Sequence, residues 1–333
     1  MSVNREKVCI LDGSNFVFRA SILPYLNYQG EATEILYGFC KMLLNLQRNF
    51  RFSEYFVCWD GGVSNRRRQL LASYKKKIDY EAEQEKLNRL ADIVDNLRKI
   101  GDEEFFKQKN EELKKQQIRW NNLLEEKKKK ERIRKQIADC KLLASLLGLN
   151  NVCFDGIEAD DLMCVLCHLL KEKKKIIVSS DKDVYQLIDK NTEVYNPITD
   201  ESLREDNFYH VTGIEKEKFI LYRCLVGDNS DNIKGIMGIG EKRAMHIIKN
   251  YSFDDLLAGR YKLEDIKIVE KVLKEKEKLL LNRELIELKV EPELLDRIKE
   301  NLNNKQTIDF NALCTFLETK GINIDPLRFE IFF

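Results

Sequence analysis

Five short apolar runs, separated by helical segments, constrain the fold of this chain most strongly. The clearest runs are residues 8–11, 55–59 and 176–178, and weaker ones are residues 152–154 and 192–195. Apolar residues at helical spacing mark segments between these runs, at residues 31–50, 137–147 and 162–170. Strands that alternate with helices predict an α/β fold, with a mostly parallel sheet covered by helices on both faces.

Acidic residues stand where these strands end. Asp12 closes the first run and Asp60 follows the second. The run at 176–178 is followed by Asp181 and Asp183, and the helix after residues 152–154 opens with Glu158, Asp160 and Asp161. Each acid alone is explained by a turn or a helix cap. Because ligands of an open parallel sheet bind beyond the carboxyl ends of its strands, the joint pattern predicts one site.

Carboxylates gathered at one edge repel each other unless cations neutralise them or some of them stay protonated. Their oxygens are hard ligands, and without accompanying His or Cys they favour Mg²⁺ or Mn²⁺. Two such ions about 4 Å apart suit the attack of water on a phosphodiester, since one activates the water and the other the leaving oxygen. The acids therefore predict metal-dependent hydrolysis of a phosphate ester.

Two more acids, Asp228 and Asp231, precede the glycine-rich stretch 235–240. Glycines permit a tight turn between two helices, and the free backbone N–H groups of such a turn bind phosphate. The residues that we expect to contact nucleic-acid phosphates here are Lys234, Gly238, Gly240, Lys242 and Arg243. The acids before the turn and the basic pair after it favour a clamp on duplex phosphates over an ordinary helix–helix turn.

Residues 79–135 depart from the alternating pattern. This segment of 57 residues holds 14 acidic and 16 basic residues, one glycine and no proline. Spaced apolar residues predict one or two long helices that form a hairpin, with a break at Gly101-Asp102. From composition alone, a solvated coiled-coil insertion explains it. We expect two domains: residues 1–205 with the insertion 64–135, and a helical region 206–333 with a helix-hairpin-helix at 228–250.

Composition excludes several classes of protein. The 333 residues carry 57 Lys and Arg against 56 Asp and Glu, for a net charge of +1, so any nucleic-acid site must be a local patch. The nine cysteines are irregularly spaced, and no leader sequence is recognisable. No uncharged apolar stretch approaches the ~20 residues that span a bilayer. These features predict a cytoplasmic protein with free thiols.

The acidic blocks together resemble those of the 5′-nuclease superfamily. They are most similar to phage-type flap endonucleases or 5′-3′ exonucleases and to the nuclease domain of bacterial DNA polymerase I. The matching blocks, in family order, are Leu11–Asn15, Trp59–Gly62, Gly156–Asp161, Ser179–Asp183 and Gly227–Ala244. The resemblance covers residues 8–290 and implies a PIN-like α/β core, a helical arch and a helix-three-turn-helix element.

The same resemblance implies two divalent ions, Mg²⁺ or Mn²⁺, and hydrolysis of DNA at a free 5′ end or a flap, which leaves a 5′-phosphate. One ion would be held by Asp12, Asp60, Glu158 and Asp160. The other would be held, or its waters oriented, by Asp161, Asp181, Asp183, Asp228 and Asp231, and Asp181 is also expected to be essential for catalysis. Replication or repair is the implied setting.

A basic stretch between residues 64 and 77 contains no acid. A solvated helix face would explain it, but Tyr74-Lys75 resembles the pair at the base of the family's arch, where the lysine meets the scissile phosphate. Arg67 resembles an arginine that the family places before this pair. The expected DNA contacts here are Arg66, Arg67, Arg68, Tyr74, Lys75 and Lys77, with Lys75 and Arg67 catalytic. Ile78 stands where relatives often have a basic residue, and Lys77 is the candidate substitute.

Two alternative functions remain open from the sequence. A nuclease directed at RNA, such as one that removes primers from an RNA–DNA hybrid, would use the same metal site. A catalytically silent binder of DNA junctions would use the arch and the glycine turn but has no need of nine carboxylates.

The C-terminal residues 329–333 resemble a sliding-clamp peptide without its glutamine, so a packed tail is favoured. A monomer is the default expectation.

Overall fold

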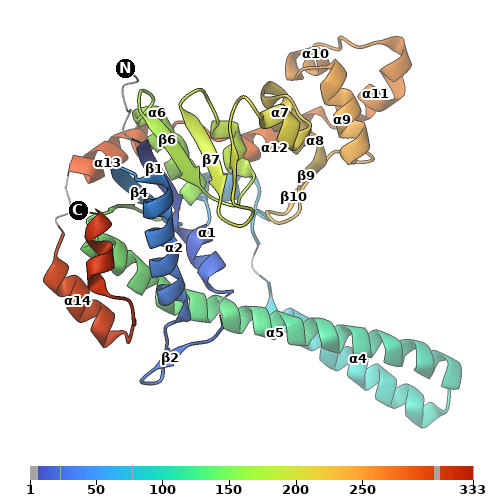
Figure 1. The fold of residues 1–333 in the computed structure, drawn as a ribbon. Helices are drawn as coiled ribbons and strands as arrows, with labels where there is room; N and C mark the ends of the chain where they lie inside the picture. Colours follow the sequence, from blue (N-terminus) through green and yellow to red (C-terminus); the bar gives the residue numbers. More distant parts are fainter. Residues whose placement is uncertain (1–6, 23, 77, 304–307, 333) are drawn as a thin grey trace. The chain divides into compact units, whose positions relative to one another are not determined.

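The computed structural model describes residues 7–22, 24–76, 78–303 and 308–332 (Figure 1). It forms two compact units: a main unit of residues up to 76 and from 137 onward, and a hairpin unit of residues 77–136. None of the described helices combines the length and the apolar run that crossing a bilayer requires.

A six-stranded sheet forms the centre of the main unit, with the strand order β5-β4-β1-β6-β7-β8. The strands are β1 (Lys7–Asp12), β4 (Glu54–Cys58), β5 (Asn150–Val152), β6 (Lys174–Val178), β7 (Thr192–Asn196) and β8 (Glu201–Leu203). All neighbours are parallel except β7 and β8. The predicted mostly parallel sheet is therefore confirmed.

Two predicted elements begin or end elsewhere than the apolar pattern suggests. β5 ends at Val152 because the following residues turn at Gly156, which has a φ of +73° and whose backbone N–H donates to the carbonyl of Gly61. Helix α2 (Glu34–Phe50) starts three residues late because Glu31–Ala32 (β3) pairs with Asn27–Tyr28 (β2).

Helices cover both faces of the sheet. α1 (Gly13–Ala20) packs against α2, β1 and β4, whereas α6 (Ala159–Leu169) packs against β1 and β4, and α13 (Pro292–Asn303) against α6. The chain passes from β1 through β4 to β5 in one direction and then returns across the sheet to β6. Because parallel crossovers are right-handed, α6 lies on the face opposite α1 and α2 (Figure 1).

The hairpin unit consists of α4 (Tyr80–Ile100) and the first part of α5 (Glu103–Leu146). Gly101, with a φ of +83°, makes the predicted break, since a left-handed residue ends α4 there. Leu90, Val94 and Ile133 are buried in the hairpin, and Glu83 of α4 is bound by Gln116 of α5. α5 continues to Leu146 as one helix, where the sequence pattern suggests two segments.

The C-terminal part of the main unit is mostly helical, as its sequence predicts. Its helices are α7 (Phe208–Thr212), α8 (Phe219–Val226), α9 (Glu241–Asn250), α10 (Phe253–Leu257), α11 (Ile266–Lys274), α12 (Lys276–Ile286), α13 and α14 (Phe310–Thr319). Between α8 and α9, a short antiparallel pair joins β9 (Gly227–Asp228) to β10 (Ile233–Lys234), and the glycine turn follows it. This turn therefore links two helices, as expected.

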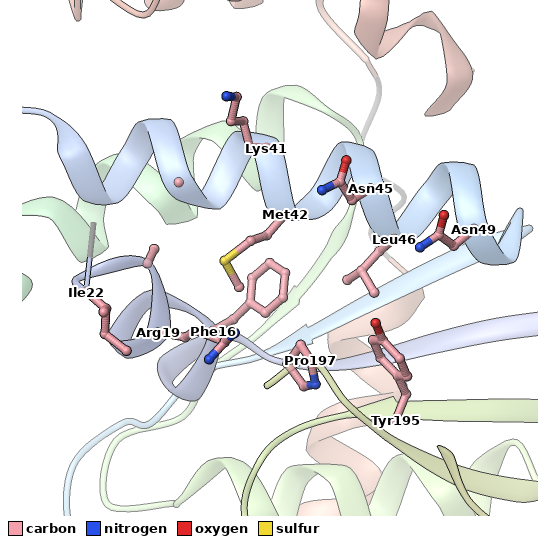
Figure 2. Close-up of a pocket in the computed structure, with 12 residues that line it drawn as sticks. Phe16, Arg19, Ile22, Lys41, Met42, Asn45, Leu46, Asn49, Tyr195 and Pro197 are labelled. Atoms are coloured by element: carbon pink, nitrogen blue, oxygen red, sulfur yellow. The ribbon is translucent and has the colours of Figure 1, made fainter. Parts of the chain in front are cut away.

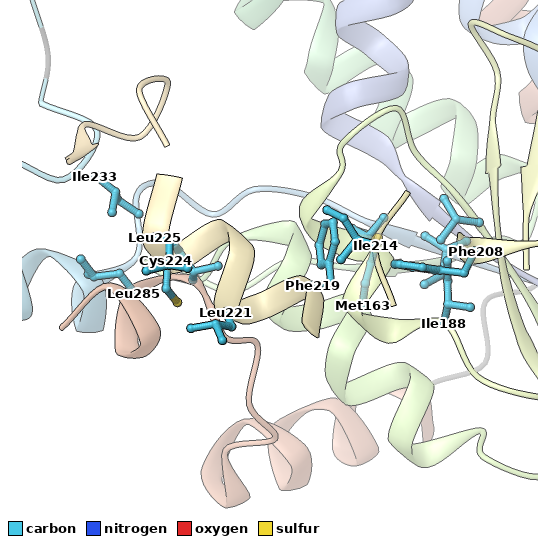
Figure 3. Close-up of a cluster of buried hydrophobic side chains, with 14 of the residues drawn as sticks. Met163, Ile188, Phe208, Ile214, Phe219, Leu221, Cys224, Leu225, Ile233 and Leu285 are labelled. Atoms are coloured by element: carbon cyan, nitrogen blue, oxygen red, sulfur yellow. The ribbon is translucent and has the colours of Figure 1, made fainter. Parts of the chain in front are cut away.

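One apolar core joins the C-terminal helices to the sheet (Figure 3). Phe208 and Phe219 meet edge to face, with ring centroids 5.7 Å apart. Leu225 of α8 and Leu285 of α12 belong to the same cluster and are fully or almost fully buried. Since both helices end close to acidic residues of the expected site, this core fixes where the site's C-terminal side chains lie.

The C-terminal tail packs against residues of α2 and β4 in the main unit. Phe329 is fully buried, Phe332 contacts the ring of Tyr55, and the backbone carbonyl of Ile331 accepts a hydrogen bond from Gln47 of α2. This arrangement supports a packed tail over a free clamp-binding peptide, and Phe333 lies outside the described residues.

We expect Leu225→Ala to lower the free energy of unfolding by about 2–5 kcal/mol, because the substitution leaves a cavity in a fully buried position of this core. Urea denaturation measures the change. Leu263→Ala, at a leucine that is 85% exposed, is the matched control and should change stability by less than about 0.5 kcal/mol. Equal effects of the two substitutions would contradict the position of α8 in the core.

Candidate active site

Three neighbouring strands bring the strand-end acids together. Asp12 is the last residue of β1, Asp60 lies two residues after β4, and Asp181 lies three residues after β6. β1 stands between β4 and β6, and the chain turns to opposite sides of β1 to form them. This is the topological switch point at which open α/β sheets bind ligands, so the expected common edge is where the structure places these acids.

The end of β1 is tied to the end of β6 by hydrogen bonds. Asp12 caps α1 by accepting from the backbone N–H of Asn15 at 3.0 Å and also accepts from the Ser179 hydroxyl at 2.9 Å. The Asn15 side chain accepts from the Ser180 hydroxyl at 2.8 Å. Asp12 is thus the helix cap that its position suggests and, at the same time, part of the acidic cluster.

No arginine or lysine salt bridge offsets Asp12 or Asp160 among the described residues. Burial raises the pKa of Asp12 to about 7, with smaller contributions from the charges of Asp60 and Asp181. Burial, then the charges of Asp181 and Asp12, hold the pKa of Asp160 well above its ordinary value. Lys75 and Arg67 act on Asp160 only as neighbouring charges, without a direct ion pair.

Arg67 neutralises the neighbouring acids. It is 2% exposed, and its guanidinium donates to Glu158 at 2.7 Å and to both oxygens of Asp161 at 2.7 and 2.8 Å. Its Nε donates to the backbone carbonyl of Leu285, at the end of α12. The structure thus gives Arg67 a place inside the protein, where a DNA phosphate has little access, in contrast to the contact that we expected.

Lys75 lies on the open side of the same acids. Its Nζ is 2.8 Å from Glu158 and 3.4 Å from Asp231, and its side chain is 33% exposed. The residue has a φ of +43°, an unusual conformation for a side-chain-bearing residue that is typical of functional sites. Tyr74, by contrast, is buried, and its hydroxyl lies within hydrogen-bond distance of both Glu158 and Asp231, so it orients acids rather than lying open to DNA.

A second group of acids lies beside Lys75. Asp183, Asp228 and Asp231 offer carboxylate oxygens that all lie within 4.8 Å of one another. Burial raises the pKa of Asp183 to about 6 although Arg223 opposes the shift. Burial also acts on Asp228, but hydrogen bonds from Ser230 and the charge of Arg223 hold its pKa below the ordinary value. Sequence patterns did not single out Arg223, since it stands in the middle of an apolar helix.

The donor set fits divalent cations. The sequence predicts nine carboxylates for this site, whereas the salt bridges of the site involve three cationic side chains, Arg67, Lys75 and Arg223. Among the described residues Asp12 and Asp160 have no salt-bridge partner, whereas Asp183 is paired with Arg223, and burial raises the pKa of all three acids. Hard oxygen donors with uncompensated negative charge are what Mg²⁺ and similar ions require.

The other expected phosphate contacts divide into paired and open side chains. Arg66 is bound to the Glu284 carbonyl and to Glu291, whereas Arg68 is exposed. Lys77 lies outside the described residues. These positions leave Arg68 and Lys75 as the more accessible cations between residues 65 and 76.

The glycine turn before α9 is open to solvent, as a phosphate clamp requires. The exposed members of the expected set are Lys234, Gly238, Gly240, Lys242 and Arg243. Gly238 has a φ of +76°, and Gly240 precedes the first residue of α9, whose N-terminal N–H groups are free to bind an anion. Lys271 of α11 also reaches Gly238, since its Nζ is 3.5 Å from where a Cβ atom would stand. No sequence motif pointed to Lys271.

A separate hollow of about 400 Å³ lies between α1, α2 and the end of β7 (Figure 2). Its walls include Phe16, Met42 and Tyr195, with Arg19 and Lys41 at the rim. None of the described residues that line it is acidic. The hollow therefore does not provide metal ligands, and the acidic edge remains the candidate active site.

Comparison with known families agrees with this site. Residues 7–217 match the family described as 5′-3′ exonuclease, N-terminal resolvase-like domain, and residues 214–314 match 5′-3′ exonuclease, C-terminal SAM fold. The chain therefore belongs to the 5′-3′ exonuclease family.

Individual relatives are similar over most of this chain. The 5′-3′ exonuclease of Aquifex aeolicus is 28% identical over 307 residues, which are 88% of this chain and 90% of that protein. The thermostable DNA polymerase I of Thermus thermophilus is 26% identical over 94% of this chain but only 32% of its own length. The match to the polymerase thus lies within one part of that protein.

Solved structures show the same fold. The T5 D15 protein co-crystallized with metal ions has a TM-score of 0.65 at 21% identity, over 90% of this chain and 99% of that one. The T5 5′-exonuclease with bound zinc has a TM-score of 0.66 at 20% identity, over 91% and 100% of the two chains. The predicted fold class and family resemblance are confirmed.

We expect Arg67→Ala to lower the free energy of unfolding by about 3–5 kcal/mol, because it leaves buried Glu158 and half-buried Asp161 without the counter-charge of Arg67. Urea denaturation at neutral pH measures this loss. Arg68→Ala removes the neighbouring exposed arginine and should change stability by less than about 0.5 kcal/mol. A loss below about 1 kcal/mol for Arg67→Ala would contradict a buried pairing role.

The raised pKa values of Asp12, Asp160 and Asp183 also predict how stability depends on pH. The folded state of such acids binds protons more tightly than the unfolded state, so stability falls as pH rises from about 4 to about 7. We expect the metal-free protein to melt at a higher temperature near pH 5.5 than near pH 7.5. Mg²⁺ should raise Tm more at the higher pH, as differential scanning fluorimetry can measure.

Asp12→Asn is the control for this pH dependence. The substitution removes one ionisable acid and keeps a side-chain oxygen that can accept the cap hydrogen bond. The metal-free variant should lose part of the difference in Tm between the two pH values. A Tm that rises steadily with pH in the metal-free protein, with the same gain from Mg²⁺ at both pH values, would show that the acids are not mutually destabilising.

Proposed function

We propose that this protein is a structure-selective 5′-nuclease that uses two Mg²⁺ ions to hydrolyse DNA phosphodiesters at free 5′ ends and flaps and leaves 5′-phosphate products. The observation that carries the proposal is the excess of carboxylates at the switch point of the sheet, where buried Asp12 and half-buried Asp160 have no salt-bridge partner among the described residues. A protein that only bound DNA would gain nothing from negative charge beside phosphates.

The acids divide by their neighbours into two proposed ion-binding groups. We assign Asp12, Asp60, Asp160 and Asp181 to one ion, because they influence each other's charge. Asp183, Asp228 and Asp231 are assigned to the other, because their oxygens lie together. Glu158 and Asp161 are held by Arg67, so we assign them to positioning. When bound, the ions would lower the pKa of water and offset the charge that develops on the phosphodiester.

The protein's own cations have distinct proposed roles. Lys75, partly exposed between Glu158 and Asp231, would contact the scissile phosphate and stabilise the charge that its oxygens gain in the transition state. Arg67 cannot make that contact from its buried position and would instead hold Glu158 and Asp161 in place. Tyr74 would add to this positioning through its hydroxyl.

DNA would be bound away from the reacting phosphate by the glycine turn. The free N–H groups at the start of α9, with Lys242, Arg243 and Lys234, would hold duplex phosphates without reading the bases. Arg68 would contribute an exposed charge near the active site. The basic residues 127–130 belong to the hairpin unit, which we propose is the family's arch, within a core domain of residues 1–205.

The cellular setting is proposed from the family. We infer action as a monomer in the cytoplasm, in replication or repair, with the helical region 206–333 as the duplex-binding part. An RNA–DNA hybrid is a second candidate substrate, because metal-bound phosphate chemistry is indifferent to the sugar. A sliding clamp is a weaker candidate partner, since Phe329 and Phe332 pack on the protein.

The test is cleavage of a 5′-labelled flap duplex in Mg²⁺, in EDTA and by the variant Asp181→Ala. We expect short 5′ fragments in Mg²⁺, none in EDTA and a loss of at least about a hundredfold in the variant, since its charge belongs to the uncompensated group. Asp206→Ala, at an exposed acid that pairs with Arg204, is the matched control and should cleave normally.

Two further arms separate the alternatives. Flaps of RNA and of DNA, digested side by side, distinguish a primer-removing nuclease from a DNA nuclease. A gel-shift assay of the same duplex in Ca²⁺ reports binding. If the protein binds the junction but cuts nothing in Mg²⁺ or Mn²⁺, the nuclease proposal fails and the silent binder replaces it.

A further inference from the structure

Arg223 lies among the acids of the second proposed ion-binding group. A single guanidinium nitrogen, Nη2, donates to Asp183 Oδ1 at 2.5 Å and to Asp228 Oδ2 at 2.7 Å. The two acids come from different parts of the chain, the turn after β6 and the end of α8. One nitrogen therefore bridges two carboxylates that the family's chemistry would give to a metal ion.

The backbone of Arg223 is fixed by its neighbours on α8. Leu221, Cys224 and Leu225 are buried in the core that joins the C-terminal helices to the sheet (Figure 3). The Arg223 side chain itself is 18% exposed and spans the distance from this helix to the acids. Any movement of the guanidinium must therefore come from rotation of the side chain.

The guanidinium is not fully satisfied where it lies. Its Nε is buried and has no hydrogen-bond partner. Fully built arginine sites use the fork of donors in paired hydrogen bonds, as Arg67 does with both oxygens of Asp161. Arg223 instead shares one nitrogen between two acids and leaves an inner donor unused, which costs free energy. The attraction between the guanidinium and the two carboxylates therefore holds the side chain in place more than a complete set of hydrogen bonds does.

A divalent ion and this nitrogen would compete for the same space. The nitrogen lies 2.5 and 2.7 Å from the two oxygens, and an ion bound by the same oxygens would lie about 2.0–2.6 Å from them. Positive charge on the guanidinium would also repel the ion. Occupation by one therefore excludes or displaces the other.

We propose that Arg223 is a built-in competitor cation, which neutralises Asp183 and Asp228 before a divalent ion binds and is released towards DNA phosphate when the ion replaces it. This inference rests on the proposed function. Because the ion must displace Arg223, the apparent affinity of the ion for this site is lowered. Because the freed guanidinium gains a phosphate partner, ion binding and DNA binding strengthen each other, as linkage between two sites requires.

The test measures metal binding without DNA. Free Mn²⁺ is followed by electron paramagnetic resonance during titration of the wild type, Arg223→Met and Arg223→Gln. Methionine preserves much of the side-chain length and removes the charge, and glutamine keeps polarity in case methionine does not fold. Circular dichroism checks the fold. We expect the weaker Mn²⁺ site to tighten by at least about fivefold in the variants, a typical coupling between sites.

The second measurement follows a fluorescent flap duplex by anisotropy in EDTA and in Ca²⁺. Wild type should gain DNA affinity from Ca²⁺, and Arg223→Met should gain less because the released cation is missing. Arg48→Met, at an exposed arginine of α2, is the matched control and should behave as wild type in both experiments.

The outcomes separate the inference from the proposed function. If wild type binds no Mn²⁺, both fail. If wild type binds two ions and the folded Arg223 variants bind them with unchanged or weaker affinity, the competitor role is overturned while the nuclease proposal stands. If the variants bind Mn²⁺ more tightly but gain as much DNA affinity from Ca²⁺ as wild type does, the release towards phosphate is overturned.

Discussion

Repulsion among carboxylates is the physical constraint on which the rest of this structure depends. Acids from three neighbouring strands and from the turn after α8 meet at the switch point of the sheet. The fold holds them with buried hydrogen bonds and with three cations, and it leaves Asp12 and Asp160 uncompensated. Divalent ions would neutralise the remaining negative charge. The repulsion that destabilises the metal-free protein therefore also provides its affinity for metal.

The C-terminal helices take part in the site as well as in DNA binding. The carbonyl of Leu285 on α12 accepts from Arg67, and α8 carries Arg223 to Asp183. The apolar core around Phe208 and Phe219 holds α8 against the sheet region. Packing of side chains far from the reacting phosphate therefore sets the positions of the charges that act on it.

Much of the fold and the acidic edge could be predicted from the sequence. Strands are marked by apolar runs, and a parallel sheet brings Asp12, Asp60 and Asp181 to one edge because the carboxyl ends of its strands coincide. The burial of Arg67 and the bridge made by Arg223 could not be predicted. Both depend on how α12 and α8 pack. The sequence does not distinguish a basic residue that faces solvent from one that pairs with a buried acid.

The left-handed backbone at Lys75 makes the N-terminal family domain dependent on the C-terminal one. The N–H of Lys75 donates to the Asp231 carbonyl, and the neighbouring Ser73 carbonyl accepts from the Asn232 side chain. A strained conformation persists only where its surroundings impose it, and here the surroundings belong to the C-terminal part. An N-terminal fragment would keep the strands and most of the acids yet lose the orientation of its lysine. The two family domains are thus separate segments of the sequence, but residues of both segments are needed to form the active site.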